Sequence, residues 1–255
     1  RDAGVEEVET DLGGYVSREN QPDGWMLGAF LKRFGSAFEP APMFAAVYHD
    51  YIIAVAEGTV IDAAWTPIET LRTSLTRSLA AGFVLGKLPS VSSVPLAQAD
   101  RSLAELYRAA ARTVSGPAHR WAILGRMLRP PKLEVPSVTF EWLDTDLATG
   151  TMTLRDENSP AVLASAWEAP DGSAAHFLAN ISGQALSFQL PLAGRSFIGP
   201  AHVTLLHDDV ATLLYEGDAP PATVAVTMPP RTIAVVSVTP RDGDLPRARV
   251  RLPRL

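Results

Sequence analysis

The sequence contains no cysteine among its 255 residues. Disulfide frameworks, zinc sites built on thiolates and cysteine nucleophiles are therefore excluded. No apolar run approaches the roughly 18 residues that a membrane-spanning helix needs, so we predict no membrane partner. A lack of cysteine fits proteins of either redox compartment, and the first residues lack the basic and apolar regions of a signal peptide, so the sequence leaves the localisation open.

Several catalytic motifs are also missing. The sequence has no Gly-rich phosphate loop, no G-x-S-x-G elbow and no H-E-x-x-H pair. His119, His176, His202 and His207 do not show the spacing of metal ligands. We therefore expect no metal and no cofactor.

Acidic residues outnumber basic ones, 28 to 22, which gives a formal net charge of -6. Residues 1–24 alone hold seven acidic residues against two arginines, a net charge of -5. Nucleic acid is not an expected partner, because phosphate binding needs a basic face. The four arginines in residues 243–255 form a basic tail, for which solvation is the simpler interpretation and contact with an anionic surface the alternative.

The chain changes character near residue 135. Before it, helical signals alternate with short apolar runs, as in βα units. Residues 66–69 combine an N-cap threonine, a proline and a glutamate, which predicts a helix that ends at Gly82. Residues 43–47 and 83–88 are predicted strands, and residues 50–65 a long loop.

Two further helices are predicted in residues 96–134. Asp100 can cap the first, which carries apolar residues at helical spacing and ends at Gly116-Pro117. The second is predicted from about Pro117 to Leu128.

Beyond residue 135 the apolar residues alternate with a period of two. The predicted strands are residues 138–142, 151–155, 162–168, 174–181, 185–190, 202–206, 210–215, 223–228 and 232–238. Residues 170–173 and Ser182-Gly183 are predicted to join strand pairs as hairpin turns, and His207-Asp208-Asp209 is a predicted turn. Trp142 and Trp167 are predicted core residues, and the whole segment an antiparallel β-sandwich.

Five features of this sequence resemble one protein family: residues 42–51, residues 82–88, residues 123–131, the hairpin of residues 166–173, and Asn180. Together they are similar to the C-terminal part of a family of bacterial glycoside hydrolases with a (β/α)8 barrel followed by an all-β domain. The resemblance spans about residues 9–240. It implies a carbohydrate substrate.

The resemblance also implies a domain organisation. Residues 1–95 resemble the last βα units of a truncated (β/α)8 barrel, because a closed barrel needs about 250 residues. Residues 96–134 would form a helical connection and residues 135–242 the β-sandwich. The chain starts with Arg1 rather than Met, and we expect the remaining barrel portion to precede it in a longer polypeptide, which would also supply the catalytic nucleophile.

Glu9 is the predicted catalytic acid. Glycoside hydrolysis normally uses two carboxyl groups, one that protonates the leaving oxygen and one that acts as nucleophile or base. In barrel glycosidases like those this family resembles, a carboxylate on a late strand is the acid. The alternative is that Glu6, Glu7 and Glu9 form an ordinary solvated acidic terminus.

Tyr48, His49, Asp50 and Tyr51 are predicted to contact substrate, because hydroxyl-binding groups and aromatic rings together suit a sugar. Their structural alternative is a strand end whose polar side chains cap loop amides and whose tyrosines are core. Trp25 and Trp65 are possible stacking platforms or core anchors, and of these we choose Trp65. Lys87 is the last predicted contact, with a solvated lysine as its alternative. A different class of function stays open: a non-catalytic carbohydrate-binding or structural β-sandwich module.

Overall fold

The computed structural model describes residues 101–123, 125–146, 151–192, 199–208 and 210–241, with a few residues between 55 and 89. From residue 101 on, helices come first and strands follow, close to the change of periodicity predicted near residue 135. None of the helices in these ranges is long and apolar enough to cross a membrane.

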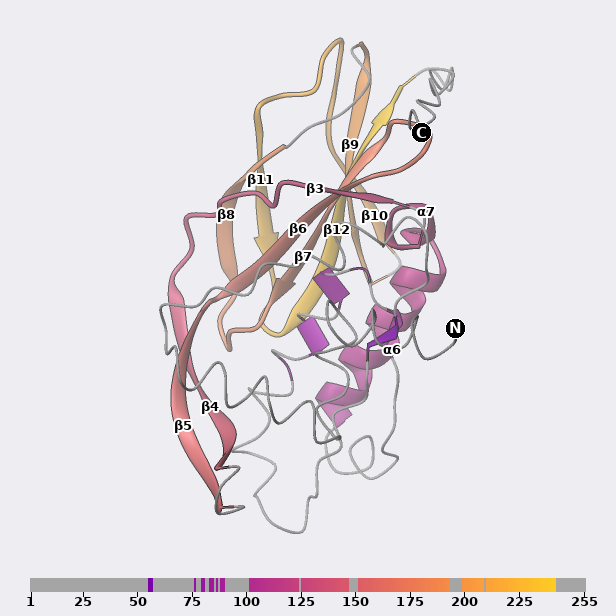
Figure 1. Ribbon diagram of the computed structural model, residues 1–255. Helices are drawn as coiled ribbons and strands as arrows, with labels where there is room; N and C mark the ends of the chain where they lie inside the picture. Colours follow the sequence, from indigo (N-terminus) through magenta and orange to yellow (C-terminus); the bar gives the residue numbers. More distant parts are fainter. Residues whose placement is uncertain are drawn as a thin grey trace, which may run out of the picture.

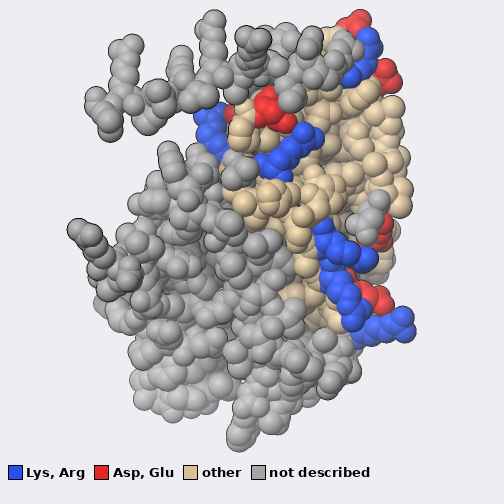
Figure 2. Space-filling model, turned by 90° about the vertical axis from the view of Figure 1, so that its right-hand side faces the viewer, with Lys and Arg blue, Asp and Glu red and all other residues tan. Residues whose placement is uncertain are grey.

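Helix α6 spans Arg101–Ser115 and confirms the first predicted helix of the connection. Leu103, Leu106, Ala110 and Val114 repeat at helical spacing and are buried. The opposite side exposes Arg101, Glu105, Arg108 and Arg112. On the side of the molecule seen in Figure 2, basic side chains lie next to acidic ones.

The second predicted helix is mostly wrong. Helix α7 covers only His119–Ala122, and Arg126–Leu128 forms strand β3 instead. At Gly125 a Cβ atom would stand 2.1 Å from the carbonyl oxygen of Trp121, so the chain leaves the helix through a contact that only glycine allows. Pairing of β3 with a neighbouring strand then replaces helical hydrogen bonds.

Every strand predicted beyond residue 135 is present. They are β4 (Ser137–Asp146), β5 (Thr151–Pro160), β6 (Val162–Glu168), β7 (Ala174–Asn180), β8 (Leu186–Pro191), β9 (Ala201–His207), β10 (Val210–Gly217), β11 (Thr223–Met228) and β12 (Thr232–Pro240). Alternation and turn residues are local signals, which explains why they located these strands.

The central sheet has six antiparallel strands in the order β10-β9-β12-β7-β6-β3. Strands β8 and β11 form an antiparallel pair of their own, as do β4 and β5, which extend to the lower left of Figure 1 as a long ribbon. The Ser182-Gly183 prediction is therefore wrong: this turn carries the chain from β7 in the central sheet to β8 in the pair. The apolar pattern of β7 and β8 fits either partner, so it does not decide the pairing.

Both faces of the central sheet are covered (Figure 1). In β7 every residue is buried, and Phe177 packs towards α6 and α7 while Leu178 packs towards β8 and β11. Trp167 is fully buried on the helical side, with its ring 6.4 Å from that of Phe177. Its predicted core position is confirmed; the side chain of Trp142 lies outside the described part.

Before α6, two short strands pair in parallel: β1 (Val55–Ala56) and β2 (Leu88–Pro89). Thr76, Leu79, Ala80, Phe83 and Val84, which lie between them in sequence, are helical. Parallel strands need such a crossover, so the α/β character predicted for this part is present here.

Two boundaries before α6 are wrong. Val55–Ala56 falls inside the predicted loop, and Phe83 and Val84 extend the helix where a strand was predicted. A short buried apolar run does not distinguish a helix from a strand. In the structure the helical Phe83 packs on Phe177 of β7, with ring centroids 5.2 Å apart.

Candidate functional site

All the predicted site residues lie outside the described part of the chain. These are Glu9, Tyr48, His49, Asp50, Tyr51, Trp65 and Lys87, and the same holds for Trp25 and the basic tail. Their roles stay predictions. Two other candidate sites lie among the described residues: the junction between the helices and the central sheet, and a groove beside α6.

The first half of the junction is the predicted hairpin turn between β6 and β7, which is confirmed. Ala169 and Gly172 close the turn by backbone bonds, Gly172 N to Ala169 O at 2.9 Å and Ala169 N to Ser173 O at 2.8 Å. Pro170 and Asp171 fill its centre, and Gly172 has a φ of 82°, which glycine adopts without strain. The Asp171 carboxylate accepts the backbone N–H of Ser173 at 2.9 Å and so fixes the turn.

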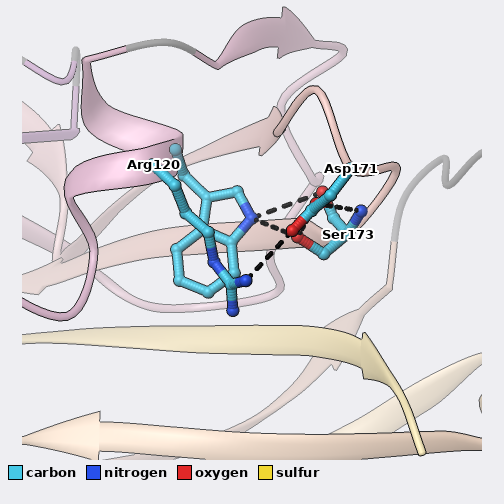
Figure 3. A network of polar contacts seen from close by, with 4 residues as sticks. Arg120, Asp171 and Ser173 are labelled. Atoms are coloured by element: carbon cyan, nitrogen blue, oxygen red, sulfur yellow. Dashed lines mark hydrogen bonds and ion pairs between the residues drawn. The ribbon is translucent and has the colours of Figure 1, made fainter. Parts of the chain in front are cut away.

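Helix α7 packs on this turn (Figure 3). The indole Nε1 of Trp121 donates to Ser173 Oγ at 3.1 Å and Ser173 O at 3.3 Å. Arg120 pairs with Asp171 at 3.0 Å, and its guanidinium lies 4.2 Å from the centroid of the Trp121 ring. Ser173 is fully buried and its hydroxyl is already bonded, so the cluster holds α7 in place and is not a nucleophilic site.

Strand β3 makes the second half of the junction. It pairs with β6, opposing Arg126 to Glu168 and Met127 to Trp167. The Arg126 guanidinium also forms an ion pair with Glu168, whose side chain is 8% exposed. Behind this pairing, Trp167 Nε1 donates to the carbonyl of Val84 at 3.2 Å, which ties the earlier helical segment to the same sheet.

Asn180 also has a structural position. It is 1% exposed at the end of β7, and its Nδ2 donates to the carbonyl oxygens of Gln184 and Pro229, both at 2.8 Å. Its Oδ1 accepts Ser182 N at 3.0 Å and Ser182 Oγ at 2.7 Å. One buried amide therefore joins the two turns that carry the chain between the sheets.

A groove of about 480 Å³ runs beside α6, and we call it the α6 groove. Its described lining is Ser102, Glu105, Leu106, Ala109, Gly183, Asp208, Pro230, Arg231, Thr232 and Ile233. These residues come from α6, from the three turns after β7, β9 and β11, and from the first two residues of β12. Such convergence of elements is typical of ligand sites, and volumes of about 300–1,000 Å³ are usual for them.

Two lining residues have left-handed backbone without being glycine: Asp208 with a φ of 48° and Arg231 with a φ of 52°. For a residue with a Cβ this conformation costs about 1–2 kcal/mol, least for Asp and Asn. Asp208 lies in the turn predicted from His207-Asp208-Asp209, but the sequence analysis did not select it as a site residue. The sequence analysis did not select Arg231. The available signal is an arginine in the turn after Pro229-Pro230, where glycine would be expected.

Within the described ranges, neither metal ligands nor shifted pKa values indicate a further candidate site. No group of three or more His, Asp or Glu side chains there is placed to hold a metal ion. Burial lowers the pKa of His176, in the middle of the central sheet, from 6.5 to about 4, and burial raises the pKa of Tyr107 on α6. Neither residue lines the α6 groove.

No family model matches the chain, and no curated protein matches it. Among solved structures, the chain is similar to a β-L-arabinopyranosidase of glycoside hydrolase family 27 from Geobacillus stearothermophilus, at 10% identity over 86% of this chain and 43% of that one, with a TM-score of 0.34. An Anoxybacillus α-amylase matches at 9% identity over 68% of this chain and 33% of that one, with a TM-score of 0.34.

A bifunctional glucanase-xylanase from a metagenome library matches at 14% identity over 35% of this chain and 18% of that one, with a TM-score of 0.25. This chain thus spans less than half the length of each of these three solved structures.

Proposed function

We propose that this chain is the C-terminal portion of an enzyme that hydrolyses glycosidic bonds, with the β domain held rigidly on the α/β part. The observation that supports this proposal is the junction. Residues 123–131 and 166–173 carry the sequence resemblance, and they pair as β3 and β6 in one cluster with α7. The distinctive residues of both segments are thus explained by one structural role.

A rigid junction favours an integral domain over a tethered module. Three kinds of contact join the helices to the sheet: the Trp121 and Arg120 bonds to the turn, the pairing of β3, and the bond from Trp167 to the Val84 carbonyl. A tethered binding module would instead be separated from its enzyme by an exposed linker with few contacts.

The chemistry proposed for the whole enzyme is paired-carboxylate hydrolysis. Glu9 would protonate the leaving oxygen, and a carboxylate upstream of this chain would act as nucleophile or base. Tyr48, His49, Asp50 and Tyr51 would contact the sugar, with Trp65 as stacking platform and Lys87 as a further polar contact. The domain bounds proposed above, residues 1–95, 96–134 and 135–242, belong to the same proposal.

The test is Glu9→Gln in the full-length polypeptide, assayed with 4-nitrophenyl and alkyl glycosides. If Glu9 is the acid, kcat falls about 100-fold or more on alkyl glycosides, whose leaving group needs a proton, and much less on nitrophenyl glycosides, whose leaving group does not. Glu6→Gln, a neighbouring acid, is the matched control and should keep full activity. Equal activity of Glu9→Gln and wild type on both substrates would refute the assignment.

A further inference from the structure

Arg231 has an unusual combination of backbone and side chain. Its φ of 52° is a conformation that glycine adopts freely and arginine does not. The turn itself needs only the backbone, whose N–H donates to Ser182 O at 3.1 Å. Strain of this kind at a groove is typical of positions where the side chain is used for binding.

The polar groups of the α6 groove have capacity left for a ligand. Within the described part of the chain, the exposed guanidinium of Arg231 forms no ion pair. Glu105 is paired with Arg101 at 2.9 Å but is 56% exposed, and Asp208 Oδ2 lies 3.6 Å from His207 Nε2. Arg231, Glu105 and Asp208, which carry one rigid fork of donors and two carboxylates, are all lining residues of the groove.

This mixture of charges selects the class of ligand. Two carboxylates oppose an anion, and the Arg231 guanidinium opposes a cation. A neutral ligand with many hydroxyl groups suits all three, because carboxylates accept hydroxyl protons and a guanidinium donates to hydroxyl oxygens. The apolar residues Leu106, Ile233 and Pro230 also line the groove, and apolar groups suit the C–H faces of a sugar.

We infer that the α6 groove is a saccharide-binding site between α6 and the turns of the β domain, with Arg231, Asp208 and Glu105 as its hydrogen-bonding residues. The choice of a neutral oligosaccharide rests on the proposed glycosidase function. The site holds the chain of a polymeric substrate and takes no part in bond cleavage.

The test is titration calorimetry of the 255-residue chain with the β-1,4-linked hexasaccharides of glucose, xylose and mannose. Wild type should bind at least one of them, and Arg231→Gly should weaken that binding at least tenfold. The same variant relieves the backbone strain, so its midpoint of urea unfolding should rise. A more stable protein that binds less tightly cannot be explained by loss of folding.

Two variants complete the test. Asp208→Asn keeps a residue that tolerates left-handed backbone but removes the carboxylate, and should also weaken binding. Arg108→Ala removes an exposed arginine of α6 that does not line the groove, and should leave the affinity unchanged. Unchanged affinity of Arg231→Gly, an equal loss in Arg108→Ala, or no binding of any hexasaccharide would each overturn the inference.

The outcome is separable from that of the proposed function. Hydrolysis by the full-length polypeptide that depends on Glu9, with no binding at the α6 groove, would reject the groove as a site and leave the glycosidase proposal standing. Groove binding that depends on Arg231, in a full-length polypeptide without hydrolytic activity, would reject the glycosidase proposal and retain the site.

Discussion

Replacing Trp121 by phenylalanine tests whether α7 holds the helices and the central sheet together. Trp121 is 1% exposed, and its indole N–H is shared between the carbonyl and the hydroxyl of Ser173. Phenylalanine keeps an aromatic ring in the same core cluster but cannot donate these bonds. The change therefore isolates the polar part of the contact.

The loss of stability expected for Trp121→Phe has three parts. Losing one buried, shared hydrogen bond costs about 1 kcal/mol. The smaller ring leaves a void of some tens of Å³, which costs about 1 kcal/mol more at roughly 24 cal/mol per Å³. The weaker cation–π contact with Arg120 adds a few tenths at most, because Arg120 is half-exposed. We expect Trp121→Phe to lower the free energy of unfolding by about 2 kcal/mol.

The assay is urea unfolding followed by far-ultraviolet circular dichroism and by tryptophan fluorescence. Ser173→Ala is made alone and together with Trp121→Phe. Both changes remove the branch of this bond that ends on the Ser173 hydroxyl, whereas the branch to the Ser173 carbonyl survives in Ser173→Ala. The double variant should therefore lose about 0.5 kcal/mol less than the two single losses combined. Both signals should report one midpoint in every variant, as expected for a single cooperative unit.

Two results would refute this reasoning. A loss below about 0.5 kcal/mol in Trp121→Phe, with additive effects in the double variant, would mean that the indole bond does not join the two parts. Separate midpoints for the two signals in wild type would mean that the helices unfold independently of the sheet. Either result would weaken the proposal of an integral β domain.

Two predictions concern the buried polar residues of β7. The folded-state pKa of His176 is lowered to about 4, so the unfolded chain binds a proton more readily between pH 6.5 and 4. The contribution of His176 to the free energy of unfolding is complete above about pH 6.5. It falls by about 2 kcal/mol between pH 7 and pH 5 and is lost below pH 4. Urea unfolding of His176→Gln should lack this fall, and an identical pH profile in the variant would contradict the assignment. Asn180→Ala should lower the free energy of unfolding by about 3 kcal/mol, because it deletes hydrogen bonds to two turns at once. In the same assay, a loss below about 1 kcal/mol would show that water replaces the amide.

Much of the secondary structure was predictable from local pattern. Helix α6 was found from its apolar spacing, and the strands beyond residue 135 from their alternation. The turn of residues 170–173 was found because proline, aspartate and glycine each fit one position of it. The wrong predictions fall where the local pattern is ambiguous: a helix is predicted over the three-residue β3, and a strand over the helical Phe83 and Val84.

Some candidate sites could be predicted from the sequence, and one could not. Glu9 and residues 48–51 are predicted site residues because residue types used in catalysis and sugar binding stand there at predicted strand ends. They lie outside the described part of the chain. The α6 groove as a whole had no signature in the sequence, because its lining comes from one helix, three turns and the start of β12, which are up to 131 residues apart. Only folding brings Glu105, Asp208 and Arg231 to one surface.

The sequence by itself determined most of the segments that become strands or helices, and that these 255 residues contain no thiol, because both depend on residue type and on spacing within a few positions. The tertiary structure decided which strands pair, that the central sheet is covered on both faces, and that β3 and the hairpin of residues 166–173 form one junction. The physical reason is that pairing and register are fixed by contacts between distant segments, such as Trp121 with Ser173, whose free energy exists only once the chain has folded.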